Sequence, residues 1–357
     1  MMNTVGFPKL GLEFTIDKVA FTIFGIDIAW YAVIIACGFL LAVLYCTARM
    51  KEFGLDADRA MDAVLVGLIG GLIGARAYYV IFSWDNYKDN LMSIFDTRSG
   101  GLAIYGGIIG ALLLGGLTCK LRKVRLRPMF DVASLGFLIG QCIGRWGNFV
   151  NVEAYGSQTD SLFGMTASSI ADGPVHPCFL YESVWCLIGF ILLHFFVKRR
   201  KFDGEIFLMY GMWYGFGRMI IEGLRTDSLY WGPFRVSQML SAALLIACFV
   251  IWLTVRSRIK RNNDPNYLPL YVTTEESKEL LRQAEEKNSK SKAKKGKEEK
   301  IVEESLEEGV KVPSDEEISR MAQEPQGDSA DEAEKTETED KENPEQEETE
   351  TTKDSVK

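Results

Sequence analysis

Two arginines lie inside apolar stretches of this 357-residue chain, and the polar residues around them are of types that bind anions. Arg145 precedes Asn148 by three positions, so on a helix the two side chains share a face. Tyr214, Arg218 and Glu222 follow one another at intervals of four and form a stripe along one helix. Because a charged side chain in hydrocarbon costs at least ~2.5–3.5 kcal/mol by insertion scales, both arginines imply a bundle interior, a counter-charge or an anionic ligand.

The stretch 144–156 is the densest of the motifs in this chain that could carry chemistry. Asn151 and Glu153 follow Arg145 at the point where a helix should end. Since arginine presents a planar fork of donors that matches phosphate, the stretch suits an anion cradle. The alternative is a structural ion pair between Arg145 and Glu153 that pins the loop.

A second group surrounds Arg218. The stripe that it forms with Tyr214 and Glu222 can face a common site, but an Arg218–Glu222 pair could also simply neutralise itself for insertion into a membrane. Arg225 follows just beyond and is a candidate gate or second phosphate contact.

The motif 176–182 places a histidine and a proline at the expected start of a helix. Structural capping is the expected role of this motif, with Glu182 suiting the helix dipole. His176 is kept as a candidate base. The seven cysteines occur singly and the chain has only two histidines, so neither a metal site nor any other cofactor is expected.

These residues must be positioned by membrane helices. The chain contains seven apolar runs near the ~20 residues needed to cross a bilayer, which predicts an all-α polytopic membrane protein. The runs are 28–48, 61–82, 101–119, 129–149, 178–197, 206–221 and 236–255. The sixth is short and contains Arg218. Glycine pairs within the runs indicate close helix packing, although Gly100-Gly101 could instead shape a re-entrant segment that lines a cavity.

The distribution of basic residues predicts the orientation of the chain. One alternate set of connections carries 16 Lys and Arg and the other carries 6, so the N-terminus is expected outside and the C-terminus in the cytoplasm. With this orientation, polar side chains fall in the outer half of the bundle, while the inner half is nearly devoid of them. We therefore expect a water-accessible cavity that opens to the outer leaflet. The outer polar residues are Tyr31, Arg76, Tyr105, Arg145, Asn148, Tyr181, Glu182, Arg218 and Glu222.

The chain changes character near residue 261. Residues 262–357 hold 29 acidic and 15 basic side chains, a net charge of −14, whereas the whole chain carries −8. We predict a catalytic membrane domain at 1–261, with a net charge of +6, and a disordered acidic cytoplasmic tail at 262–357 with a transient helix near 274–290.

The three motifs resemble, in order and over about residues 20–260, the prolipoprotein diacylglyceryl transferase family of bacteria. The resemblance implies an inner-membrane transferase that moves the diacylglyceryl group of phosphatidylglycerol to the lipobox cysteine of a preprolipoprotein and releases glycerol phosphate. It implies localisation in the plasma membrane, with membrane lipid, phosphatidylglycerol and lipobox peptides as partners and no nucleic acid. Functional residues of the family fall on Tyr31, Arg145, Asn148, Glu153, Gly156, Tyr214, Arg218 and Glu222.

One position departs from the family pattern. Many members carry a histidine before the Gly106-Gly107 pair, in a place proposed for the general base, whereas this chain has Tyr105. A phenol with an ordinary pKa near 10 is a poor proton acceptor at neutral pH, so Tyr105 is expected to position the lipid. The proton acceptor stays open among Glu153, Glu222, His176 and dissociation of the thiol itself.

The mechanism we expect is displacement at the glycerol carbon that bears the phosphoester. Arg145 and Arg218 would bind the phosphate and stabilise the charge of the departing group, and Asn148 would orient a head-group oxygen. A transporter or flippase for an anionic lipid is the alternative function, since it would also place arginines in a membrane cavity. A scaffold acting through the acidic tail is a third possibility, although we expect activity to survive removal of 265–357.

Overall fold

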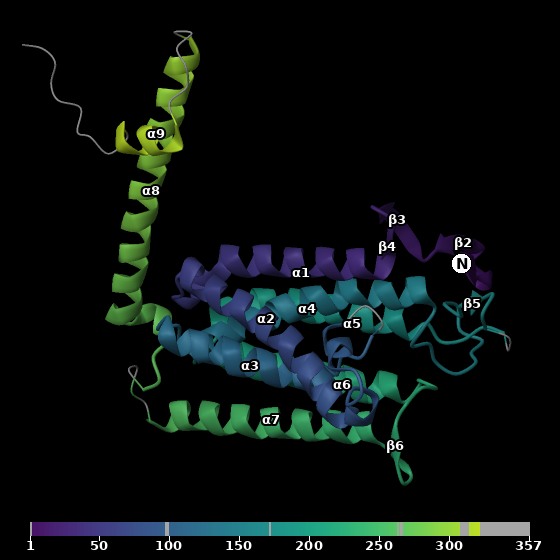
Figure 1. Cartoon of the computed structure of the whole chain (residues 1–357). Helices are drawn as coiled ribbons and strands as arrows, with labels where there is room; N and C mark the ends of the chain where they lie inside the picture. The colour runs from purple at the N-terminus through teal and green to yellow at the C-terminus, as the bar shows by residue number, and fades with distance from the viewer. Residues whose placement is uncertain are drawn as a thin grey trace, which may run out of the picture. The chain divides into compact units, whose positions relative to one another are not determined.

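The computed structural model describes residues 2–96, 100–170, 173–262, 264, 267–307 and 314–321. The chain divides into two compact units, 1–286 and 287–357. In the first unit, apolar helices run beside one another and the strands gather at one end of them (Figure 1). These helices are α1 Trp30–Arg49, α2 Ala57–Phe82, α3 Ile104–Leu121, α4 Leu126–Asn151, α5 Cys178–Phe196, α6 Glu205–Glu222 and α7 Val236–Asn262. Short 3-10 turns occur at Pro8–Leu10, Met50–Phe53, Trp84–Asn86, Leu91–Phe95, Val197–Arg199 and Tyr271–Thr273.

Each predicted apolar run coincides with one of these helices. Among the described residues, six helices are long and apolar enough to cross a membrane. The exception is α6, whose 18 residues include Glu205, Arg218 and Glu222. This helix packs against α4, α5 and α7.

Glycines bring α2 and α3 into close contact, as the sequence predicted. A Cβ at Gly74 would lie 2.4 Å from the carbonyl oxygen of Gly106, and one at Gly110 would lie 2.1 Å from that of Gly70. Any side chain at these positions would force the two helices apart, so the small residues set their separation.

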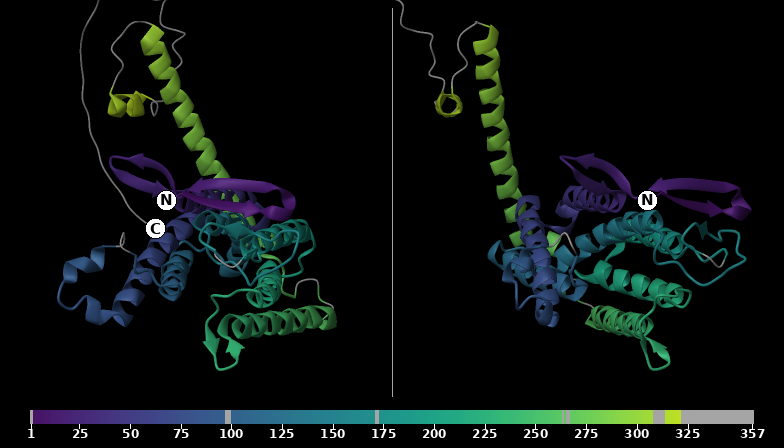
Figure 2. Two further views of the ribbon diagram at one scale, coloured as in Figure 1. Left: turned by 90° about the vertical axis from the view of Figure 1, so that its right-hand side faces the viewer. Right: turned by 45° about the vertical axis from the view of Figure 1, so that its right-hand side comes forward.

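The N-terminal segment departs from the all-α prediction. It forms two antiparallel hairpins, shown in purple in Figure 2, and β1 also pairs with β5. Phe24 and Gly25 join one hairpin and both have positive φ, the geometry of a type I′ turn. The strands are β1 Met2–Phe7, β2 Leu12–Asp17, β3 Val19–Ile23, β4 Ile26–Ala29, β5 Thr166–Ala167, β6 Tyr230–Trp231 and β7 Phe234–Arg235.

The sheet covers the ends of α4 and α5. Val5 and Phe7 from β1 are buried against Met165 and Val175 of the loop between these helices, and Phe179 of α5 joins the same apolar cluster. The loop that carries part of the predicted site is therefore fixed by a core of its own.

The prediction that the inner half holds almost no polar groups was wrong. Asp131 on α4 and Glu205 on α6 are both fully buried. The Asp131 carboxylate accepts the backbone N–H groups of Gly204 and Phe207 at 2.7 and 2.9 Å and so caps α6. Glu205 accepts bonds from the Nε1 of Trp252 at 2.9 Å and the Nε of Arg256 at 2.6 Å, which tie α6 to α7.

The described part of the tail differs from the predicted disorder. Residues Glu275–Glu307 form α8, and Asp315–Met321 form α9 in the second unit. The prediction for 322–357 lies outside the described residues. In the second unit, Lys294 donates to the hydroxyl of Ser319 at 2.8 Å.

Residues 267–286 dock on the end of the bundle that carries the α1–α2, α3–α4 and α5–α6 connections. The Tyr271 N–H donates to Asp203 at 2.7 Å, and the fully buried Ser277 donates to the carbonyl oxygen of Gly54 at 2.9 Å. Arg125 pairs with Glu276 at 2.5 Å. The start of the tail is therefore an integral part of the folded bundle.

We expect Ser277→Leu to lower the melting temperature of the purified protein. The variant removes a buried hydrogen bond and adds volume where the side chain is fully buried, a loss of ~1–3 kcal/mol. Ser291→Leu, at an exposed position of α8, is the matched control. Equal melting temperatures for the two variants would contradict docking of 267–286.

Candidate active site

Glu182 on α5 lies between the two arginines that the sequence singled out. It forms an ion pair with Arg145 of α4, and its Oε1 lies 2.8 Å from the Nη1 of Arg218 on α6. Arg218 also pairs with Glu222 one turn further along α6, at 2.6 Å. The side chains of Glu182 and Glu222 are 7% and 2% exposed, so this network is shielded from water.

This arrangement corrects the role predicted for Glu182. Glu182 lies beyond the first turn of α5. That first turn contains no acidic residue, and the N-cap residue makes no side-chain capping hydrogen bond. Its carboxylate instead balances the positive charges of Arg145 on α4 and Arg218 on α6. A buried carboxylate is tolerated when it is paired, and removing one partner of such a pair leaves an uncompensated charge.

The register of α5 and α6 is set by two tryptophans next to this network. The Nε1 of Trp185 donates to the carbonyl oxygen of Trp213 at 3.0 Å, and Trp213 returns the same bond to Trp185 at 2.9 Å. Their rings stack with centroids 4.2 Å apart. Gly189 and Gly217 leave space for the indoles, since a Cβ at Gly217 would lie 2.1 Å from the Nε1 of Trp185. The stacked indoles keep Glu182 level with Arg218 along the axes of the two helices.

A chain of hydrogen bonds extends from Arg145 toward the outer loop. Its Nη1 donates to the Oδ1 of Asn148 at 3.3 Å, and the Nδ2 of Asn148 donates to Glu153 at 2.8 Å. Asn151 also approaches Glu153, at 3.4 Å. The ion pair between Arg145 and Glu153 considered from the sequence is therefore replaced by the pair with Glu182. Asn148 therefore connects Glu153 to Arg145, and Arg145 in turn pairs with Glu182.

Arg225 joins the network from the loop after α6. It forms two bonds to Asp227, at 2.8 and 2.6 Å, and its Nη1 lies 3.7 Å from Glu182. These bonds raise the pKa of Arg225 and lower the pKa of Asp227. The Arg225 backbone bridges to Gly156, where a Cβ would lie 2.7 Å from the Cβ of His176. Glycine is needed at Gly156 because two loops meet there.

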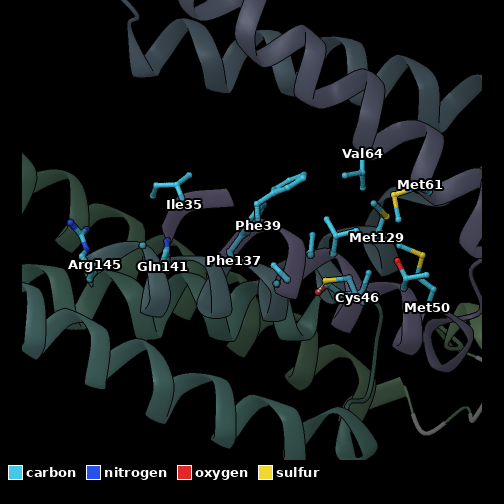
Figure 3. Close-up of a pocket in the computed structure, with 18 of the residues that line it drawn as sticks. Ile35, Phe39, Cys46, Met50, Met61, Val64, Met129, Phe137, Gln141 and Arg145 are labelled. Carbon is cyan, nitrogen blue, oxygen red and sulfur yellow. Dashed lines mark hydrogen bonds between the residues drawn. The ribbon is translucent and has the colours of Figure 1, made fainter. Parts of the chain in front are cut away.

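A cavity of about 490 Å³ opens beside Arg145, between α1, α4 and the start of α2 (Figure 3). Its lining includes Tyr31, Gln141, Arg145 and Asn148 at the end near the network. The Tyr31 ring packs over Gly147, where a Cβ would lie 2.7 Å from it. Arg145, whose side chain is 24% exposed, thus connects the buried network with an accessible space.

Within the described part of the chain, the other predicted site residues do not line this cavity. Arg218 faces the carboxylates, and Tyr214 stacks on Tyr210 with centroids 6.0 Å apart. His176 Nδ1 lies 3.2 Å from the hydroxyl of Tyr181. Tyr105 lies in the first turn of α3 and is 59% exposed.

The sequence analysis expected Arg76 in the outer half of the bundle, among the polar residues of the cavity. The structure shows it 8% exposed and bonded to five backbone carbonyl oxygens at 2.6–3.0 Å. Two of them belong to Gly100 and Gly101, so these carbonyls bind a guanidinium instead of lining the cavity beside Arg145. Arg76 therefore holds the segment that leads into α3.

Together, these features define a polytopic helical membrane protein with a buried arginine–glutamate network at the end of an apolar cavity. Within the described ranges, no group of His, Cys, Asp and Glu side chains could hold a metal ion.

Comparison with known proteins identifies the family. Residues 18–254 match the prolipoprotein diacylglyceryl transferase family, and this chain belongs to it. Relatives named phosphatidylglycerol–prolipoprotein diacylglyceryl transferase are 42% identical in Clostridioides difficile, 43% in Finegoldia magna and 42% in Enterococcus faecalis. The matches cover 69%, 70% and 74% of this chain and 98%, 99% and 97% of the respective relatives.

We expect Glu182→Gln to destabilise the protein strongly, because it leaves two buried guanidiniums without their shared carboxylate. Loss of one partner of a buried pair costs about 3–5 kcal/mol, which thermal unfolding in detergent would detect. Glu153→Gln is the matched control, because Glu153 is exposed and accepts amide hydrogen bonds only. A melting temperature of Glu182→Gln equal to that of the control would show that Glu182 does not balance the arginines.

Proposed function

We propose that this protein transfers the diacylglyceryl group of phosphatidylglycerol to the lipobox cysteine of preprolipoproteins. Membership of the family and the names of the relatives support this activity. The structural observation that carries the proposal is Arg145, which reaches from the buried network into the polar end of an apolar cavity. An anionic lipid has the matching form, with one charged end and long apolar chains.

In the proposed reaction, the cysteine sulfur attacks the glycerol carbon that bears the phosphoester. A carbon–sulfur thioether bond forms, the carbon–oxygen bond breaks, and glycerol phosphate leaves with the bonding electrons. The thiol proton goes to a base. Because negative charge accumulates on the departing phosphate, a fixed guanidinium beside it lowers the barrier.

Arg145 is the residue we assign to the phosphate. Its Nη2 contacts Glu182. Among the described residues its Nη1 makes only a long, 3.3 Å bond to Asn148, so this side of the guanidinium is weakly engaged. Asn148 and Tyr31 line the same end of the cavity and can orient head-group oxygens. Arg218 lies behind Glu182, where it pairs with both Glu182 and Glu222 and so holds the Glu182 carboxylate in place.

Glu153 is the proton acceptor we propose. It is exposed and lies one hydrogen bond from Asn148, which lines the cavity. Glu222 is 2% exposed and engaged with Arg218, and His176 lies near Tyr181, which makes both less suitable. Tyr105 keeps a proposed role in contacting lipid and takes no part in proton transfer.

We further propose that all seven helices α1–α7 cross the plasma membrane of a bacterium. The excess of basic residues in one set of connections supports an outer N-terminus and a cytoplasmic start of the tail. The site would then face the outer leaflet, where phosphatidylglycerol and the lipobox peptide meet.

A transporter for an anionic lipid is less consistent with the molecule. The polar side chains that line the cavity near Arg145 gather at one end, while the buried Asp131 and Glu205 at the other end are used in capping and ion pairing. The family match also supports transfer over transport.

We expect Arg145→Lys to lower turnover about 100-fold, since a single ammonium cannot reproduce the fork of donors at the departing phosphate. The assay combines the purified protein with labelled phosphatidylglycerol and a lipobox peptide. Arg122→Lys, at an exposed position after α3, is the control for the same change. Near-normal turnover by Arg145→Lys would exclude the proposed phosphate role.

Removal of 287–357 should leave transfer intact, because these residues form a separate compact unit. The shorter chain ending at 286 retains the docked segment and is assayed with the same lipid and peptide. Loss of transfer with an unchanged melting temperature would favour a scaffold that acts through the tail.

A further inference from the structure

The cavity beside Arg145 continues along the α1–α4 interface far beyond the polar network. On α4 its lining positions recur at helical spacing from Asn148 back to Met129, and on α1 they run from Tyr31 to Thr47. Figure 3 shows Arg145 and Gln141 at one end and three methionines, Met50, Met61 and Met129, at the other. The cavity is therefore most polar at its outer end, and at its inner end three flexible thioethers line it together with Cys46 and Thr47.

The length of this cavity suits a hydrocarbon chain. Arg145 and Met129 are sixteen residues apart on one helix, which corresponds to ~24 Å at ~1.5 Å per residue. The hydrocarbon core of a bilayer is ~30 Å thick, so the inner end lies beyond its midplane. A volume of about 490 Å³ spread over this length leaves a narrow space.

We propose that this cavity holds one acyl chain of the phosphatidylglycerol donor and that Met129, with Met50 and Met61, limits the length of that chain. The inference rests on the proposed transferase function. With the phosphate at Arg145, the chain extends past Gly140 and Ala133 toward the methionines. A Cβ at Gly140 would meet no atom within 4 Å, which agrees with open space along this side of α4.

Methionine suits the end of such a cavity. Its unbranched, polarisable side chain adapts to irregular space, so three methionines can close around the end of a chain without a fixed shape. Because the chain moves from bilayer hydrocarbon into the cavity, selectivity depends on packing, and a chain that stops short of the methionines leaves a void and loses dispersion contacts. Chains that are too long must bend or leave the cavity.

The test uses the fact that the lipopeptide product retains both acyl chains. The full-length protein is given an equimolar mixture of phosphatidylglycerols whose saturated chains lengthen from lauroyl to stearoyl, together with a lipobox peptide. Mass spectrometry of the product then gives the relative kcat/KM for each chain length. Because the lipids compete in one sample, the ratio does not depend on the amount of folded enzyme.

Two variants should shift this ratio in opposite directions. Ala133→Leu fills the space above the methionines and should lower the use of stearoyl relative to lauroyl lipid about 10-fold, as expected when a pocket is shortened by a few methylenes. Met129→Ala deepens the cavity and should raise the same ratio. Ala243→Leu and Met239→Ala make the same changes at exposed positions of α7 and should leave the ratio unchanged.

The possible failures are distinguishable. If the unmodified protein produces no lipopeptide from any of the lipids, the proposed transferase function fails. If it produces lipopeptide and neither cavity variant changes the chain-length ratio relative to its α7 control, the acyl-chain assignment is overturned while the transferase function stands.

Discussion

A single carboxylate between two guanidiniums is the interaction on which the site depends. Arg145, Arg218 and Glu182 come from three different helices and lie in an apolar bundle, where each charge alone would be costly. Pairing makes their burial possible, and it also leaves Arg145 sharing its carboxylate with another arginine. Glu222 also pairs with Arg218, so the two arginines and the two glutamates of the network balance in charge. Arg145 is the member of this network that lines the cavity, and we propose that its guanidinium meets the phosphate there.

The placement of α6 shows how the rest of the bundle serves this network. Its composition is too charged for a helix that faces lipid, but each of its charged groups meets a partner. Asp131 caps its N-terminal end, Glu205 binds α7, and Arg218 reaches Glu182 near its C-terminal end. Between these points the stacked Trp185 and Trp213 fix the position of α6 along the axis of α5. The helix is held in place by specific polar contacts along its whole length.

The sequence predicted features that depend on neighbouring residues. Apolar length located the helices, and the spacing of Arg218 and Glu222 allowed the ion pair that the structure shows, which the sequence left open beside a shared binding stripe. It could not predict that Glu182 serves both arginines, because its partners lie on other helices and the nearby proline suggested capping. The N-terminal hairpins were not predicted, because the turn at Phe24-Gly25 requires positive φ at a bulky residue that rarely adopts it, and apolar runs of membrane length gave no assignment for the first 27 residues. Composition predicted disorder for the tail, yet Tyr271 and Ser277 find specific partners on the bundle.

The most direct measurement is the position of the lipid phosphate in an experimental structure of the protein bound to phosphatidylglycerol. If Arg145 binds the phosphate as proposed, phosphate oxygens lie within hydrogen-bonding distance of Arg145, at the polar end of the α1–α4 cavity, while Glu182 still contacts Arg218. A phosphate bound elsewhere, with Arg145 engaged only by Glu182, would contradict the proposal.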